Sequence, residues 1–171
     1  MKKVLILVIA FFIITGCSNK DNNVSNIEKK VEKNNEIKTT ISCYNEGFLF
    51  HSKKSVDHIM FLDKDNKLIK YDHIEKYFSF DDDNDFTMIC EGAPEEAENN
   101  NKLYNYLNEV ADCNKESKEV TITDIYDISK MESKNKIPSD EVKDNLNDDF
   151  ILDVDGFKSA IGNKGYTCRE M

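Results

Sequence analysis

The chain has 171 residues and carries 33 acidic against 23 basic side chains, which gives a formal net charge of −10 at pH 7. A field of this sign repels phosphate groups, so the composition argues against nucleic acid as a partner and against binding of an anionic bilayer by the folded surface. Residues 39–171 contain no repeat at a fixed period and no linker rich in Pro or Gly, so we expect them to form one globular domain.

The N-terminus has the pattern of a signal peptide. Lys2 and Lys3 precede the uncharged apolar residues 4–14, and polar residues soon end this run. A membrane-spanning helix needs about 20 apolar residues, roughly twice this length. The run therefore predicts the core of a cleaved signal rather than a permanent anchor.

The cleavage site is the most specific motif in the chain. Ile14, Thr15 and Gly16 directly precede Cys17, and together they resemble the lipobox of bacterial lipoprotein precursors. The resemblance implies that residues 1–16 are removed as a lipoprotein signal peptide and that Cys17 takes a diacylglyceryl group and becomes the lipidated first residue. The alternative is ordinary secretory cleavage that leaves Cys17 as a disulfide partner.

The predicted mature protein is more acidic than its precursor. Residues 1–16 hold two of the 23 basic residues and none of the 33 acidic ones, so their removal changes the net charge from −10 to −12. Acyl chains contribute about 0.8 kcal/mol per buried methylene, so lipid on Cys17 would hold the protein on the extracytoplasmic face of the cell membrane. The polar residues 17–38 would form a flexible lipidated tether with a span of roughly 25 Å.

Four cysteines remain once Cys17 is assigned to lipid, namely Cys43, Cys90, Cys113 and Cys168. Outside the membrane they predict two disulfides, for which three connectivities are available. The sequence has no Cys-x-x-Cys pair, and none of its three histidines stands at ligand spacing from a cysteine. Neither a metal site nor a cofactor is therefore predicted.

The first part of the domain has the alternation and composition of β-strands. We expect strands in residues 39–44, 48–50, 56–62 and 67–80, with the turn cluster 63–66 closing a hairpin. If Leu62 pairs with Leu68, the antiparallel register places His58 opposite Asp72 and Val56 opposite Ile74. His58 is then expected to form a cross-strand ion pair with Asp72.

The three histidines allow two interpretations. His51, His58 and His73 would form a metal or catalytic cluster if the fold brought them together. No cysteine or carboxylate lies beside them at ligand spacing, so we favour three unrelated surface or half-buried imidazoles, and no catalytic residue is assigned.

The acidic run at residues 81–85 resembles a calcium loop only at first sight. The turn glycine of such a loop would fall on Phe86, and Gly92 stands where the closing Glu is required. We interpret the run as a helix N-terminus, because Phe86 begins an apolar helical stripe that continues through Ile89, Cys90, Ala93 and Ala97. Gly92 and Pro94 predict a kink or a restart of this helix.

A second hairpin is predicted in residues 107–113 and 119–128 around the turn 114–117, although residues 103–110 could also continue the helix. Helix and strand rises place Cys90 about 18 Å before the helix end and Cys113 about 20 Å back along the returning strand. This geometry favours a Cys90–Cys113 disulfide and leaves Cys43 to pair with Cys168. Short helices are expected after Pro138 and over residues 155–162.

Several short motifs are similar to those of small uncharacterised lipoproteins of gut Firmicutes, in a layout like that of YehR-like lipoproteins. They are residues 41–43, the hairpin 61–67, residues 126–130 and residues 165–168. The resemblance implies an α+β fold with an antiparallel sheet. The elements predicted from the residues give this sheet about five to six strands, with one longer helix packed on it and short C-terminal helices. The resemblance carries no catalytic residues over to this chain.

Three functions are compatible with these features. The first is a non-catalytic module that binds a surface protein or glycan, and we expect it to be monomeric. The second is a small cell-envelope hydrolase that uses Glu75 with His73 or Asp72. The third is a solute-binding lipoprotein, for which about 130 folded residues is small. Aromatic residues that could line a ligand face, although we expect them in the core, are Tyr71, Tyr77, Phe78, Phe80 and Tyr126.

Overall fold

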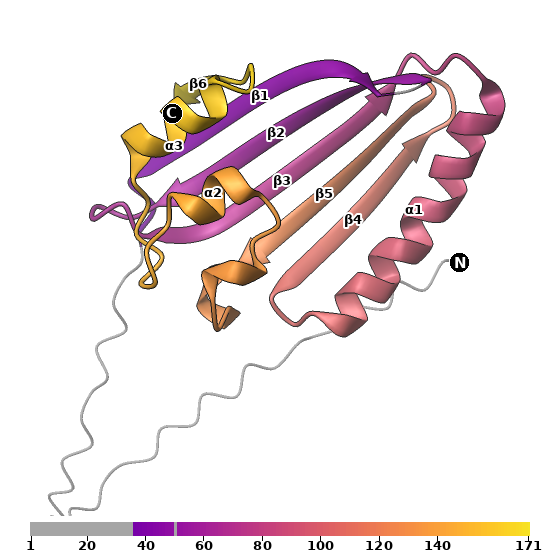
Figure 1. The fold of residues 1–171 in the computed structure, drawn as a ribbon. Helices are drawn as coiled ribbons and strands as arrows, with labels where there is room; N and C mark the ends of the chain where they lie inside the picture. The colour runs from indigo at the N-terminus through magenta and orange to yellow at the C-terminus, as the bar shows by residue number, and fades with distance from the viewer. Residues whose placement is uncertain (1–35, 50) are drawn as a thin grey trace, which may run out of the picture. The chain divides into compact units, whose positions relative to one another are not determined.

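The computed structural model describes residues 36–49 and 51–171, which form an α+β fold (Figure 1). A six-stranded antiparallel sheet carries one long helix and several short ones, so the predicted fold class is confirmed. The predicted signal peptide, Cys17 and all but the last residues of the predicted tether lie outside the described residues. Within the part that is described, no helix is long and apolar enough to cross a membrane.

The sheet is built from three hairpin-connected strands, a second hairpin beside them and a short C-terminal strand. Its spatial order is β4-β5-β3-β2-β1-β6, so the last strand returns to pair with the first. The strands are β1 (Thr39–Leu49), β2 (Ser52–Leu62), β3 (Leu68–Phe78), β4 (Leu107–Asn114), β5 (Glu119–Asp127) and β6 (Thr167–Glu170).

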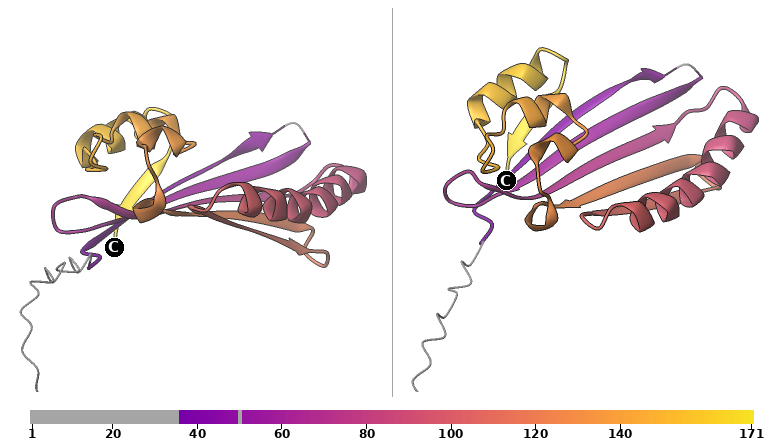
Figure 2. Two further views of the ribbon diagram at one scale, coloured as in Figure 1. Left: turned by 90° about the horizontal axis from the view of Figure 1, so that it is seen from below. Right: turned by 60° about the horizontal axis from the view of Figure 1, so that its bottom comes forward.

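The helices cover one face of this sheet. Val120 packs against the long helix and Tyr126 joins the core beneath the C-terminal helices, and these two residues of β5 share a face because an even number of positions separates them. Figure 2 shows the C-terminal helices standing on one side of the strands. The helices are α1 (Asp83–Leu103), η1 (Ile128–Lys130), η2 (Lys134–Lys136), α2 (Asp140–Asp144) and α3 (Val154–Gly162).

Two separate cores lie under the helices. Under α1, Phe86, Cys90 and Ala93 pack on Val120, as the apolar stripe of the sequence predicts. Under α2 and α3 lies a larger core, whose fully buried members include Ile41, Met60, Leu62, Tyr71, Val142, Phe157 and Ile161. The sheet face between these two cores is not fully covered by either group of helices.

The predicted register of β2 and β3 is wrong by one residue. Leu62 does pair with Leu68, but a β-bulge follows at once, so His58 lies opposite His73 rather than Asp72, and Val56 lies opposite Glu75. Strict alternation would place Leu68 and Tyr71 on opposite faces of the sheet, yet both are fully buried. The bulge adds one residue to β3 between them and so brings both side chains to the same face.

The long helix begins as predicted but does not restart. The Asp82 carboxylate caps α1 by accepting a hydrogen bond from the backbone N–H of Asn84. The helix then continues through Gly92 and Pro94 as one element. Proline removes one backbone hydrogen bond, and burial of the apolar face on the sheet offsets that loss.

Two disulfides tie the helices and strands together. Cys43 of β1 is bonded to Cys168 of β6, and Cys90 of α1 is bonded to Cys113 of β4. These are the two pairs expected from the sequence. One bond closes the two ends of the domain, and the other fastens the long helix to the edge of the sheet.

The two disulfides should contribute unequally to stability. Their sequence separations are 125 and 23 residues, so the chain-entropy model gives about 5 kcal/mol for Cys43–Cys168 and about 3.5 kcal/mol for Cys90–Cys113. We expect the double variant Cys43→Ala/Cys168→Ala to lose more stability in urea unfolding than Cys90→Ala/Cys113→Ala.

Peptide mapping without reduction should yield only the Cys43–Cys168 and Cys90–Cys113 linkages, and a Cys43–Cys90 or Cys43–Cys113 peptide would contradict the pairing.

Candidate functional site

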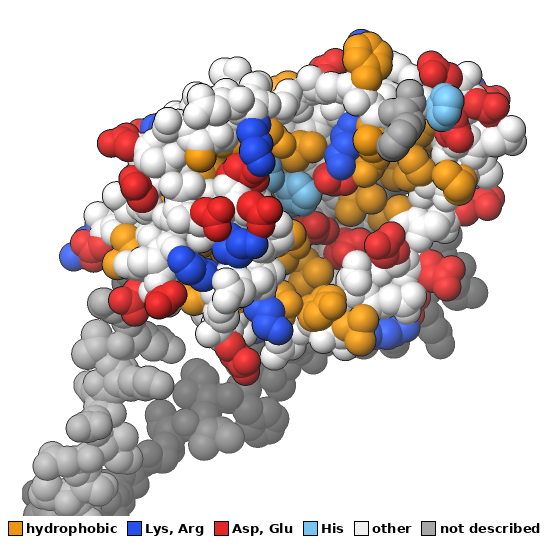
Figure 3. Space-filling model, in the orientation of Figure 1, with side chains coloured by type: hydrophobic (Ala, Val, Ile, Leu, Met, Phe, Trp, Pro, Cys, Tyr) orange, Lys and Arg blue, Asp and Glu red, His pale blue; other side chains and the backbone are white. Residues whose placement is uncertain are grey.

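A groove lies on the helix-covered face of the sheet, between α1 and the C-terminal helices. It consists of two adjoining hollows of about 400 and 320 Å³ that share His73, Glu75 and Pro138. The larger hollow lies against α1, and we call it the acidic pocket. Figure 3 shows acidic side chains gathered around the hollow on this face. The acidic pocket is also lined by Tyr77, Glu96, Asn100, Tyr104, Leu107, Glu109, Ile122, Asp124 and Tyr126.

Strand alternation and helix spacing bring these side chains together. The floor is formed by side chains at inward-facing positions of β3, β4 and β5. At these positions the strands carry His73, Glu109 and Asp124 in place of apolar residues. The α1 wall comes from Glu96, Asn100 and Tyr104, at the C-terminal end of the helix. A spacing of four residues puts Glu96 and Asn100 on one side of the helix, next to its buried stripe, and Tyr104 follows as the C-cap residue.

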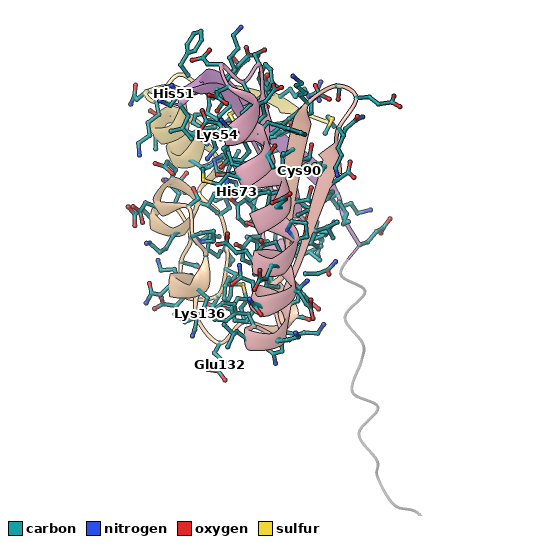
Figure 4. All side chains as sticks on the ribbon, turned by 90° about the vertical axis from the view of Figure 1, so that its right-hand side faces the viewer. His51, Lys54, His73, Cys90, Glu132 and Lys136 are labelled. Carbon is teal, nitrogen blue, oxygen red and sulfur yellow. A yellow bond between two sulfur atoms is a disulfide. The ribbon has the colours of Figure 1, made fainter. Side chains whose placement is uncertain are left out.

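His73 lies between two carboxylates on the groove floor. Its Nδ1 is 3.4 Å from Asp124 Oδ2, and its Nε2 is 3.6 Å from Glu75 Oε1. The Lys54 ammonium and the Tyr77 hydroxyl each donate a hydrogen bond of 2.6 Å to Glu75. Figure 4 shows Lys54 and His73 between α1 and the C-terminal helices.

Asp124 is held less completely than Glu75. Its Oδ2 accepts from the Tyr126 hydroxyl at 3.4 Å and faces His73, whereas its Oδ1 is buried without a hydrogen-bond partner. A buried carboxylate oxygen that lacks a donor costs free energy. The Asp124 carboxylate is therefore held through one of its two oxygens only.

Glu109 links the edge strand to the end of α1. The Asn100 amide donates to Glu109 Oε2 at 2.7 Å, and the Asn101 side chain bonds both the backbone N–H and the backbone carbonyl of Glu109. Burial raises the pKa of the Glu109 carboxyl, the hydrogen bond from Asn100 opposes this rise, and the negative charges of Asp124 and Glu96 add to it.

Glu75 has the opposite behaviour in the same groove. Burial disfavours its ionised form, but the hydrogen bonds from Lys54 and Tyr77 outweigh burial and lower its pKa. One groove thus holds a carboxyl whose pKa is raised and another whose pKa is lowered. Many hydrolases that use two carboxyl groups have such a pair, in which the group with the raised pKa acts as the acid and the group with the lowered pKa acts as the base or nucleophile.

His58 lies beneath the second hollow of the groove. Its ring stacks on His73 with centroids 5.0 Å apart, and its Nδ1 is 2.6 Å from the Tyr71 hydroxyl. Burial lowers the pKa of His58 to about 4, and repulsion from His73 adds to the shift. His58 is therefore neutral at pH 7 and belongs to the buried support of the groove.

The structure brings together only some of the residues singled out in the sequence. His58 and His73 stack on each other, so they are not unrelated, whereas His51 lies apart, near Asp81 (Figure 4). The predicted His58–Asp72 ion pair is wrong, because Asp72 points to the opposite face and bonds Lys70. Across residues 36–49 and 51–171, no group of three or more His, Cys, Asp or Glu residues is placed to hold a metal ion.

The aromatic residues divide between core and groove. Tyr71 is fully buried in the larger core, and Phe80 packs beside the α1 core, as expected. Tyr77 and Tyr126 line the acidic pocket in addition to their packing. Phe78 contacts the Lys76 ammonium on the uncovered face of the sheet.

Sequence reasoning missed the wall of the groove, which comes from Glu96, Asn100, Tyr104 and Glu109. A signal for it was present, because the first three are spaced four residues apart beside an apolar stripe. Glu109 and Asp124 also occupy inward positions of two alternating strands. A charged residue at an inward strand position marks a site that the core does not fill.

The buried imidazole makes stability depend on pH. The unfolded chain takes up a proton on His58 near pH 6.5, and the folded chain resists it until about pH 4. We expect this group to cost about 3 kcal/mol of stability as the pH falls across that interval. The variant His58→Gln should flatten the pH dependence of urea unfolding between pH 6.5 and 5. His51→Gln, at an exposed position, should leave it unchanged, and equal slopes for all three proteins would contradict the assignment.

Comparison with known proteins adds little to this site. The chain matches no protein-family model and no curated protein. Among solved structures, the NMR structure of a protein from Streptococcus pneumoniae TIGR4 matches with a TM-score of 0.44 and 13% identity, over 92% of this chain and 99% of that one. Similarity at this level supports no conclusion about function, so the groove must be interpreted from its own residues.

Proposed function

We propose that the protein is a lipid-anchored extracytoplasmic lipoprotein, similar in layout to YehR-like lipoproteins, and that its domain is a non-catalytic module which binds its ligand in the groove. The lipobox resemblance at Cys17 supports the anchor. The net charge of −12 expected for the mature chain supports lipid, rather than the folded surface, as the contact with the membrane. We expect a monomer that does not bind nucleic acid.

The single observation that supports a binding role is the lining of the groove. Ligand sites are concave, about 300–1,000 Å³ in volume, and combine apolar or aromatic walls with a few convergent polar groups. The acidic pocket has this combination, with Tyr77, Tyr104 and Tyr126 beside the carboxylates of Glu109 and Asp124. Its α1 wall is attached to β4 by a disulfide and by the bonds of Asn100 and Asn101, which supports a site that needs little ordering when a ligand binds.

A second function, a small glycan hydrolase of the cell envelope, is favoured by one observation. Glu109 and Glu75 line the same pocket with pKa values shifted in opposite directions, as a general acid and a nucleophile or base require. In this arrangement Glu109 would protonate the leaving oxygen, and Glu75 would act on the anomeric carbon or on a water.

The anchor can be tested by labelling the full chain with a radioactive fatty acid in a bacterial host. We expect wild-type protein to be labelled and to sediment with membranes, and we expect Cys17→Ser to lose the label, because its hydroxyl cannot form the thioether to the lipid. Ser18→Ala is the matched control and should be labelled as wild type. Labelling of Cys17→Ser would rule out the anchor.

The groove can be tested by binding of the full chain, in a non-ionic detergent, to an array of cell-wall glycans, peptides and amines. We expect Tyr104→Ala to weaken any binding at least about tenfold, because it removes one aromatic wall. Phe48→Ala is the control, since Phe48 is exposed on the uncovered face. Binding that survives Tyr104→Ala would place the ligand elsewhere. Cleavage of a glycan that is lost in both Glu109→Gln and Glu75→Gln would favour the hydrolase instead.

A further inference from the structure

We propose that the acidic pocket binds an organic cation that carries several amine or guanidinium groups. This inference rests on the proposed binding function and specifies the chemistry of its ligand. The cation can be a free polyamine or the basic side chains of a peptide, and the two present the same chemistry to the pocket.

Most charged side chains in the lining of the acidic pocket are carboxylates. Four carboxylates line the acidic pocket, and one of them, Glu75, is neutralised by Lys54. The other three, on Glu96, Glu109 and Asp124, have no lysine or arginine among the lining residues, and His73 is the one basic side chain there. Like charges in a half-enclosed site of low dielectric repel each other strongly, so a ligand of opposite charge is favoured.

The Asp124 carboxylate is incompletely hydrogen-bonded. Asp124 Oδ1 is buried without a partner. Burial raises the pKa of the Glu109 carboxyl, and the negative charges of Asp124 and Glu96, which line the same pocket, add to this rise. An ammonium or guanidinium group in the pocket would donate charge-assisted hydrogen bonds to the carboxylate oxygens that face it and would relieve the repulsion among them.

The lining of the acidic pocket is also aromatic. Tyr77, Tyr104 and Tyr126 border the same pocket. Tyrosine rings attract ammonium and guanidinium groups over their faces and pack against methylene chains, which polyamines and basic side chains both contain. A neutral sugar would also pack on these rings, but it would add no positive charge beside Glu96, Glu109 and Asp124.

A bare metal ion fits the pocket less well than an organic cation. No metal-binding group of three or more ligand residues occurs in the described parts of the chain. The hollow of about 400 Å³ is far larger than one hydrated ion and suits a ligand of drug-like size. Three carboxylates without a lysine or arginine partner in the pocket, spread over α1, β4 and β5, match several cationic groups on one flexible molecule.

The inference can be tested by isothermal titration calorimetry of the full chain in a non-ionic detergent. The probes are putrescine, spermidine, N-acetylated spermidine and a short arginine-containing peptide. We expect affinity to rise with the number of positive charges and acetylation to weaken binding. Asp124→Asn and Glu109→Gln should each lower the affinity for spermidine at least about tenfold, because each removes a charge-assisted hydrogen bond. Glu96→Gln, on the helix surface, should lower it without any risk to the fold.

The matched control is Asp112→Asn. Asp112 is exposed on the same strand as Glu109 but on the opposite face, so it makes the same change in net charge outside the pocket. Equal weakening by Asp112→Asn would show that binding is only a response to the acidic surface and would overturn the inference. Preference for Ca²⁺ over spermidine would overturn it as well. Binding of neutral glycans alone would overturn the proposed cationic ligand but would leave the groove as a binding site. If no probe bound, the result would count against the cationic ligand and against the binding function.

Whichever cation source is correct, the same titration identifies it. Tighter binding of spermidine than of the peptide indicates a free polyamine, and the reverse order indicates basic side chains of a protein. Both results support the inference, because they share the interaction with Glu96, Glu109 and Asp124.

Discussion

The organisation of this protein depends on how the helices divide one face of the sheet. The α1 helix covers the side formed by β4 and β5, and α2 with α3 covers the side formed by β1, β2 and β6. Along β3 and β5, the inward-facing positions therefore lie first in one apolar core, then in the open groove, and then in the other apolar core. The groove is thus a consequence of incomplete coverage, and polar residues occupy the inward positions that no helix covers.

The same constraint explains why the two disulfides and the Asn101 bonds stand where they do. A groove between two helical walls stays open only if each wall is attached to its own side of the sheet. The Cys90–Cys113 bond fixes the middle of α1, and Asn100 with Asn101 fixes its end to Glu109 on the edge strand. The Cys43–Cys168 bond fixes the last strand against the first, beside the core that α3 covers. The two disulfides therefore lie on opposite sides of the groove, one between α1 and β4 and the other between β1 and β6.

Much of the fold could be predicted from local patterns. Alternation predicted most of the strands, although the strands predicted in residues 39–44 and 48–50 correspond to the single strand β1 (Thr39–Leu49). The stripe from Phe86 predicted the buried face of α1, and the acidic run at residues 81–85 marked its N-terminus, where Asp82 is the cap. The register of β2 and β3 could not be predicted this way. The bulge beside Leu68 allows both Leu68 and Tyr71 to be buried in the core, and no local sequence pattern indicates it. The groove could not be obtained either, because the division of one sheet face between two helical groups depends on how distant segments pack. His73 was visible as a residue but not as the neighbour of Asp124, which lies 51 residues away.

The central claim is that the acidic pocket between α1 and the sheet floor is the ligand site. The most direct measurement is a ¹H–¹⁵N NMR titration of the protein with spermidine. We expect the amide signals of Glu96, Glu109 and Asp124 to shift together and to saturate with one binding constant, while those of the exposed acidic run at Asp81–Asp83 stay in place. Shifts confined to that run, or spread evenly over all exposed carboxylates, would contradict it.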